Sequence, residues 1–67
     1  MPTIRLNGES RVLPEGTTVA ALLSELGLDR GPVAVEINRK ILPKTRYDSQ
    51  ALGDSDRVEI VTVVGGG

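Results

Sequence analysis

The sequence has 67 residues, enough for one small domain whose core supplies roughly 3–5 kcal/mol of net stability at most. Eight basic and nine acidic residues give a net charge of -1, and Tyr47 is the single aromatic residue, so the basic surface and stacking platforms of nucleic-acid-binding proteins are excluded. Cys and His are absent, which excludes Ser-His and Cys-His nucleophiles, the usual zinc and iron–sulfur ligands, and a cysteine persulfide.

The N-terminal residues Met1–Arg5 contain no apolar run of the kind found in signal peptides. No stretch of the sequence approaches the length of apolar residues needed to span a bilayer. We therefore expect a cytoplasmic protein with no membrane partner.

The first elements in chain order are a hairpin and a helix. Thr3–Leu6 alternates polar and apolar residues and predicts a strand with Ile4 and Leu6 on one face. Asn7-Gly8 favours a type I′ turn, and the return strand is expected from Glu9 to Leu13, where Pro14 stops it.

A helix is predicted over Thr18–Leu26, after a turn at Glu15-Gly16. Thr17 or Thr18 provides the N-cap, and Gly27 suits the left-handed residue after the last turn. The apolar residues of the helix recur at i, i+3, i+4 and i+7 and form one stripe: Val19, Leu22, Leu23 and Leu26.

The second half of the chain predicts three strands. The first is a central strand, Val33–Ile37, with Val33, Val35 and Ile37 toward the helix. After a turn at Asn38–Lys40 come a very short strand, Ile41-Leu42, and an irregular stretch, Lys44–Gln50, pinned by Tyr47. Leu52 is expected to anchor a tight turn. Asp54 and Asp56 in this turn are interpreted as turn formers rather than as a cation site. The longest strand is predicted over Arg57–Val64, which is rich in β-branched residues.

The last strand has two faces. If Val58 and Ile60 face the helix, Val61 and Val63 lie on the opposite face with Arg57 and Glu59. These valines reflect ordinary β-propensity, are covered by the loop around Tyr47, or form, with the adjacent Val64, a docking surface for a partner.

Three glycines, Gly65, Gly66 and Gly67, follow this strand. They are a terminus without function, a remnant of recombinant expression, or a thin stem that threads into a partner's active site. Three extended residues reach roughly 10 Å.

The order of elements resembles the ubiquitin-like β-grasp fold, and the terminal glycines resemble its sulfur-carrier branch. Within that branch the whole chain is similar to the sulfur carriers of thiamine biosynthesis, the ThiS family. The matching motifs are Leu6-Asn7-Gly8, Gly16-Thr17-Thr18-Val19, Val35-Glu36-Ile37-Asn38 with Ile41-Leu42-Pro43-Lys44, and Gly53–Ile60 leading to the glycines. The chain departs from the family in having three glycines rather than two, and Val63 where many members have an aromatic residue.

This resemblance implies an α+β fold: a β-grasp domain over residues 1–64 with a mixed four- to five-stranded sheet and one main helix across one face, followed by a flexible tail, residues 65–67. It also implies that a ThiF-type adenylyltransferase uses ATP to activate the Gly67 carboxylate. A sulfur donor such as a cysteine desulfurase then forms a thiocarboxylate, and thiazole synthase (ThiG-type) takes the sulfur. On this hypothesis Gly65 and Gly66 form the threading stem, and the chain is a monomeric carrier that binds no cofactor or metal and is not an enzyme.

Three other functions fit parts of the sequence. The small subunit of molybdopterin synthase has the same fold and chemistry, but its members are typically longer and richer in aromatic residues. A ubiquitin-like modifier would join the same activated glycine to lysines of target proteins. A β-grasp binding module would leave the glycines without a role.

Overall fold

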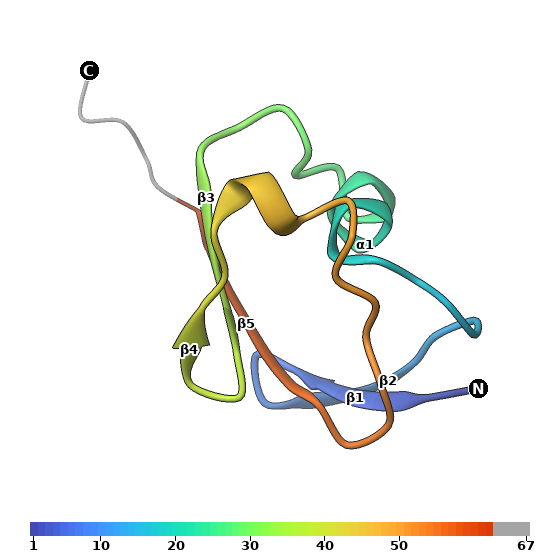
Figure 1. The fold of residues 1–67 in the computed structure, drawn as a ribbon. Coiled ribbons are helices and arrows are strands. Elements are labelled where there is room, and N and C mark those ends of the chain that lie inside the picture. Colours follow the sequence, from blue (N-terminus) through green and yellow to red (C-terminus); the bar gives the residue numbers. More distant parts are fainter. Residues whose placement is uncertain (63–67) are drawn as a thin grey trace.

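The computed structural model describes residues 1–62, which form a five-stranded sheet with one α-helix across one face (Figure 1). The elements in chain order are β1 (Thr3–Leu6), β2 (Glu9–Val12), α1 (Val19–Glu25), β3 (Val33–Ile37), β4 (Lys40–Ile41), the 3₁₀ helix η1 (Lys44–Arg46) and β5 (Arg57–Thr62). The predicted α+β architecture is therefore confirmed, with five strands rather than four. No helix within these residues has the length and apolar character needed to cross a membrane.

The strand order is β2-β1-β5-β3-β4, so β5 lies at the centre of the sheet. It pairs in parallel with β1 and antiparallel with β3. The prediction that Val33–Ile37 is a central strand is confirmed, since β3 is an interior strand with a neighbour on each side, but the middle strand of the five is β5. Periodicity identifies a buried strand but carries no information about its neighbours, which depend on long-range pairing.

The first hairpin forms as predicted. Asn7 and Gly8 both have positive φ, 49° and 86°, and Leu6 pairs with Glu9 across the turn. β2 ends at Val12, one residue earlier than predicted. The next residue, Leu13, is buried, and its N–H donates to the carbonyl of Pro2 at 2.9 Å.

The helix is capped at both ends. The hydroxyl of Thr18, rather than that of Thr17, accepts the N–H of Ala21 at 3.1 Å. At the other end Gly27 has a φ of 74°, its N–H donates to Ser24, and the N–H of Leu28 donates to Leu23. This pair of hydrogen bonds is a Schellman motif. The helix was predicted over Thr18–Leu26 and is one residue shorter at each end, because Thr18 and Leu26 are its caps.

A second hairpin joins β3 to β4. Asn38 and Arg39 both have positive φ, 51° and 69°, so the turn has two residues and β4 is Lys40–Ile41, not Ile41-Leu42. The stretch that follows was predicted to be irregular but begins with η1. Tyr47 pins it as predicted: its carbonyl accepts the N–H of Ala20 at 2.9 Å.

The core lies between the helix and the sheet. Its buried members come from both layers and from the two connecting segments: Ile4, Leu13, Val19, Leu22, Leu23, Val35, Leu52, Val58 and Ile60. All of the buried residues in this core are apolar. The single helix therefore covers one face of the sheet and leaves the other uncovered within residues 1–62.

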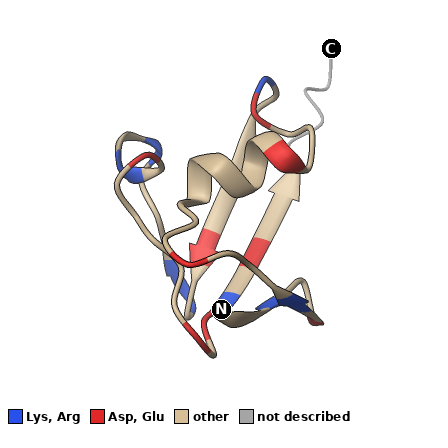
Figure 2. Ribbon diagram, turned by 90° about the vertical axis from the view of Figure 1, so that its right-hand side faces the viewer, with Lys and Arg blue, Asp and Glu red and all other residues tan. Residues whose placement is uncertain are grey.

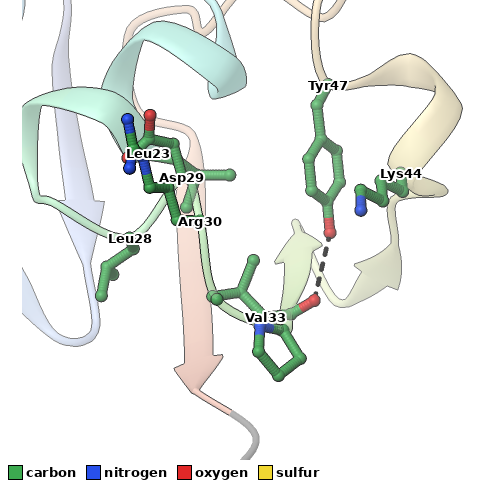
Figure 3. A pocket seen from close by; sticks show the side chains of 9 residues that line it. Leu23, Leu28, Asp29, Arg30, Val33, Lys44 and Tyr47 are labelled. Atoms are coloured by element: carbon green, nitrogen blue, oxygen red, sulfur yellow. Dashed lines mark hydrogen bonds between the residues drawn. The ribbon is translucent and has the colours of Figure 1, made fainter.

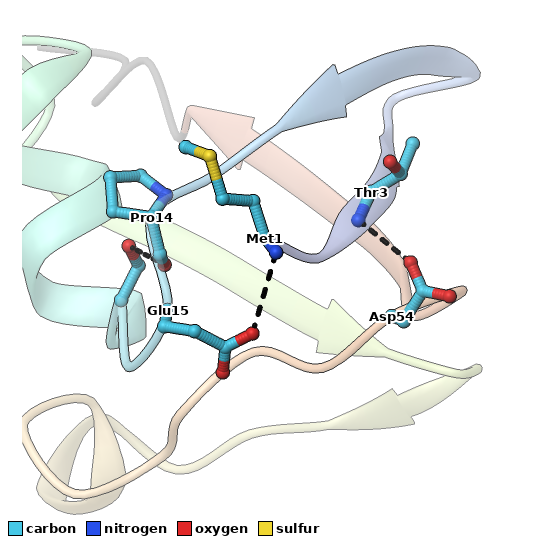
Figure 4. A network of polar contacts seen from close by, with 6 residues as sticks. Met1, Thr3, Pro14, Glu15 and Asp54 are labelled. Carbon is cyan, nitrogen blue, oxygen red and sulfur yellow. Dashed lines mark hydrogen bonds and ion pairs between the residues drawn. The ribbon is translucent and has the colours of Figure 1, made fainter.

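Polar contacts hold the start of β1 to the turn before β5 (Figure 4). The N–H of Thr3 donates to the Asp54 carboxylate at 2.8 Å, and the terminal amine lies 3.6 Å from the Glu15 carboxylate. The Asp56 carboxylate accepts the N–H of Gly53 at 2.8 Å. Asp56 thus acts as a turn former, as interpreted from the sequence, whereas the Asp54 carboxylate ties the turn to β1.

Candidate docking face and C-terminal glycines

The predicted site residues divide into two groups. Val61 lies in β5 and is described by the structure. The other predicted docking residues, Val63 and Val64, and the predicted carrier glycines, Gly65, Gly66 and Gly67, lie outside the described residues. Thr62, the last described residue, pairs with Val33 at the start of β3.

The two faces of β5 differ as the alternation predicted. Val58 and Ile60 are buried against the helix, whereas Val61 on the opposite face is 60% exposed. The alternative prediction, that the loop around Tyr47 covers this face, is therefore wrong for Val61. Tyr47 packs beside the helix-side core instead, and its hydroxyl donates to the carbonyl of Val33 at 3.5 Å (Figure 3).

Further apolar side chains share the exposed face of the sheet. Ala34 lies directly opposite Val61 on β3 and is exposed. Ile41, which pairs with Glu36 on the same face, is 78% exposed. Exposed apolar side chains grouped next to polar ones are typical of protein interaction surfaces.

Two asparagine side chains hold β5 from opposite sides. Asn7, at the end of β1, accepts the N–H of Ile60 at 2.9 Å and donates to the Ile60 carbonyl at 3.2 Å. Asn38, at the end of β3, accepts the N–H of Arg57 at 2.9 Å. Their place in the sequence predicted only turn roles for these two residues. Asparagine at the first position of each turn was the available signal, because its amide can pair with a backbone N–H and C=O as a strand residue would.

A groove of about 370 Å³ lies between the segment after the helix and η1 (Figure 3). Its floor is apolar, with Leu23 and Val33, and its rim has charges of both signs, including Arg30, Asp29 and Lys44. The sequence analysis did not predict this groove. Within residues 1–62, no three Asp or Glu side chains gather into a possible metal site.

Comparison with known proteins gives consistent results. The ThiS family matches residues 4–67 of the chain. The sulfur carrier protein ThiS of Bacillus subtilis is 40% identical over 65 residues, a match that covers 96% of this chain and 98% of that protein.

A thiazole synthase of Paramagnetospirillum magneticum is 50% identical over 62 residues, which are 92% of this chain. The chain spans only about a fifth of the length of that relative, 19%. This thiazole synthase therefore contains a segment similar to the present chain.

Comparison with solved structures agrees with the sequence matches. The crystal structure of the thiamine biosynthesis protein ThiS from Geobacter metallireducens superposes with a TM-score of 0.81 at 31% identity, covering 97% of this chain and 99% of that one. The family match includes the strands, the helix and the glycines, and the superposition places the same elements in the same arrangement. The chain belongs to the ThiS family and has its β-grasp fold.

Proposed function

We propose that this chain is a sulfur carrier in the formation of the thiazole ring of thiamine, with the sulfur held as a thiocarboxylate on Gly67. The main support is that the ThiS family match extends to residue 67 and that a relative named as a sulfur carrier aligns over nearly its full length. The chain itself is a carrier and not a catalyst.

The proposed chemistry has two steps at one carbonyl carbon. The Gly67 carboxylate attacks the α-phosphorus of ATP, pyrophosphate leaves, and an acyl-adenylate forms. Hydrosulfide (HS⁻) then attacks the carbonyl carbon, AMP leaves with one of the two former carboxylate oxygens, and a thiocarboxylate remains. When the nucleophile is the outer sulfur of a donor's persulfide, an acyl disulfide forms first, and a thiol must reduce its S–S bond to release the thiocarboxylate. Adenylation is needed because a free carboxylate is a poor electrophile, whereas AMP is a good leaving group.

The sequence favours the carboxylate as the point of attachment. There is no cysteine in the chain, so sulfur cannot be held as a side-chain persulfide. Glycine lacks a side chain beyond the α-carbon, which lets a partner's backbone approach closely. β5, the strand that leads to these glycines, is paired on both sides and further held by Asn7 and Asn38, so the stem begins from a rigid base.

The proposal assigns the remaining chemistry to partners in the cytoplasm. A ThiF-type adenylyltransferase binds the ATP, a donor such as a cysteine desulfurase supplies sulfur, and a thiazole synthase receives it. The similarity between this chain and a segment of a thiazole synthase supports the last of these partners. The carrier is monomeric between encounters.

The test is the intact mass of the chain after incubation with the adenylyltransferase and sulfur donor of its own organism, ATP and a sulfur source. We expect the mass gain of one oxygen replaced by one sulfur, and none in a chain that lacks residues 65–67. Conjugates of high mass with other proteins would instead indicate a modifier. An unchanged mass, together with thiamine-independent growth of a strain that lacks residues 65–67, would contradict the proposal.

The small subunit of molybdopterin synthase is the nearest alternative, since its fold and chemistry are the same. The compared relatives with named functions belong to thiamine biosynthesis, which favours the thiazole pathway. Growth without thiamine and molybdoenzyme activity, both measured in a deletion strain, separate these two functions.

A further inference from the structure

The uncovered face of the sheet presents three successive rows of side chains along β5. In the first row Arg57 lies beside Arg5 of β1. In the second row Glu59 lies directly opposite Glu36 of β3. In the third row Val61 lies opposite Ala34. The rows are thus cationic, anionic and apolar, in that order toward residue 63, and Figure 2 shows the acidic positions of β3 and β5 side by side.

Each charged row brings together two groups of the same sign. Glu36 and Glu59 are directly opposed on antiparallel strands, where β-carbons lie about 4.5–5.5 Å apart and like charges are destabilising. Arg5 and Arg57 are neighbours on the parallel strands β1 and β5. Within residues 1–62 the ion pairs are Met1–Glu15 and Arg11–Glu25, so neither row is neutralised by an ion pair of its own. Glu36 is half-buried, which increases the cost of its unpaired charge.

A hollow of about 200 Å³ separates the first row from the turn of the first hairpin. It is lined by Arg5, Gly8, Arg57 and Glu59. The space beside Gly8 is open, because a β-carbon at this position would meet no atom within 4 Å. The hollow is lined by two guanidinium groups and by one carboxylate, that of Glu59, so positive charge is in excess there. Such a site suits a partner's carboxylate, which arginine binds with two parallel hydrogen bonds.

We propose that this face is the docking surface for thiazole synthase, and that the two charged rows select the partner and fix its orientation. The synthase places a carboxylate at Arg5 and Arg57, basic side chains over Glu36 and Glu59, and an apolar side chain over Ala34 and Val61. The inference rests on the proposed function. Thiazole synthase is the chosen occupant because one such enzyme contains a segment similar to this chain, so the two units work together in one polypeptide.

The order of the rows also sets the direction of docking. The apolar row is nearest to Gly67 in the sequence and the cationic row is farthest. The entrance to the synthase active site is therefore next to its apolar contact, and its acidic group lies on the far side. A partner with the reverse order of charges would meet like charges and bind more weakly.

The test exchanges the charges without changing their number. The variant R5E/R57E/E36K/E59K keeps the net charge and keeps like charges opposed within each row, so its thermal midpoint should match that of the wild type. Its dissociation constant for the thiazole synthase of the same organism should rise about tenfold or more at ~0.1 M salt. Wild-type binding should weaken with added salt, because exposed charges are screened.

A second pair of variants compares two charge changes on this face with two charge changes outside it. E36K/E59K should weaken binding about tenfold, whereas E9K/D29K, with the same change in net charge at exposed positions off this face, should weaken it less than about twofold. Equal affinity of E36K/E59K and E9K/D29K, or wild-type affinity of the four-residue exchange, would overturn the proposal.

Two further outcomes are distinguishable. A wild-type dimer in sedimentation that E36K/E59K dissociates would make a second copy of the chain the occupant and would also overturn the proposal. If the wild type never gains sulfur, the proposed function fails; if it gains sulfur and binds the synthase but the charge variants bind equally well, this inference alone fails.

Discussion

The two faces of β5 are built from alternate residues of one strand, yet one contributes to folding and the other is exposed to solvent. Val58 and Ile60 on one face are buried in the core, while Arg57, Glu59 and Val61 on the other are exposed. The buried face obtains its free energy from removing apolar surface from water. The exposed face retains like-charge pairs that oppose folding. Neighbouring positions should therefore respond to substitution in opposite directions.

The largest expected effect tests the buried side of this comparison. Leu22 lies in the core opposite β5 with no exposed surface, so Leu22→Ala should lower the free energy of unfolding by about 2–5 kcal/mol. A domain of this size should then be largely unfolded at 37 °C, as measured by denaturant titration and circular dichroism. Ser24→Ala, on the exposed side of the same helix, should change the free energy of unfolding by less than about 0.5 kcal/mol. A similar loss in both variants would contradict the assigned core.

A smaller effect on stability is expected at Asn7, whose side chain holds the backbone of β5. Asn7→Gly keeps the positive φ of the turn but removes both hydrogen bonds to Ile60. The Ile60 N–H is then left without a partner while partly buried, so the free energy of unfolding should fall by about 1–3 kcal/mol. The Ile60 amide should also lose protection in hydrogen exchange. Asn38→Gly serves as the matched variant, in which the Arg57 amide and not that of Ile60 should lose protection. Unchanged exchange at Ile60 in Asn7→Gly would rule out the proposed role.

The exposed face should respond with the opposite sign. Glu59→Lys replaces a like-charge pair with an opposite-charge pair across from Glu36, which should raise the free energy of unfolding by about 0.2–1 kcal/mol. The same change should weaken the association with thiazole synthase. Glu59→Gln, measured in the same denaturant titration, should fall between the wild type and Glu59→Lys. A loss of stability in Glu59→Lys would mean that the pair is not repulsive.

The smallest expected change in stability accompanies the largest change in function. Gly66→Val should leave thermal unfolding unchanged, because the core residues lie between Ile4 and Ile60. It should abolish formation of the acyl-adenylate, since a β-branched side chain restricts the backbone and widens the stem. Release of pyrophosphate measures this step, with Gly31→Ala as a control for loss of glycine elsewhere, where a β-carbon meets no atom within 4 Å. Full activity of Gly66→Val would show that no narrow channel receives the stem.

Much of the fold follows from local signals in the sequence. The Asn7-Gly8 turn, the Thr18 cap, the apolar stripe of the helix and the Gly27 C-terminal motif each depend on a few adjacent residues, and all were predicted. The second turn was harder, because Arg39 has no local preference for its φ of 69°. Asn38 compensates through its hydrogen bonds to Arg57, 19 residues away. Such long-range support cannot be read from the turn itself.

The candidate site was predicted in part. Alternation along the last strand correctly placed Val61 on an exposed face. The pairing of Glu36 with Glu59 and of Arg5 with Arg57 depends on the register and neighbours of β5, which the sequence pattern does not specify. The roles of residues 63–67 remain predictions from composition and family resemblance.

The central place of β5 also has a consequence for biosynthesis. The hairpin β1–β2 and the hairpin β3–β4 are joined in the sheet only through β5, which is the last of the five strands to be synthesised. A nascent chain that stops before Arg57 has two separate hairpins and an incomplete core, and isolated two-stranded hairpins are marginal in water. Translation must therefore pass the strand that leads to the glycines before the domain becomes stable. An abortive product that stops before Arg57 would therefore remain unfolded and open to proteolysis.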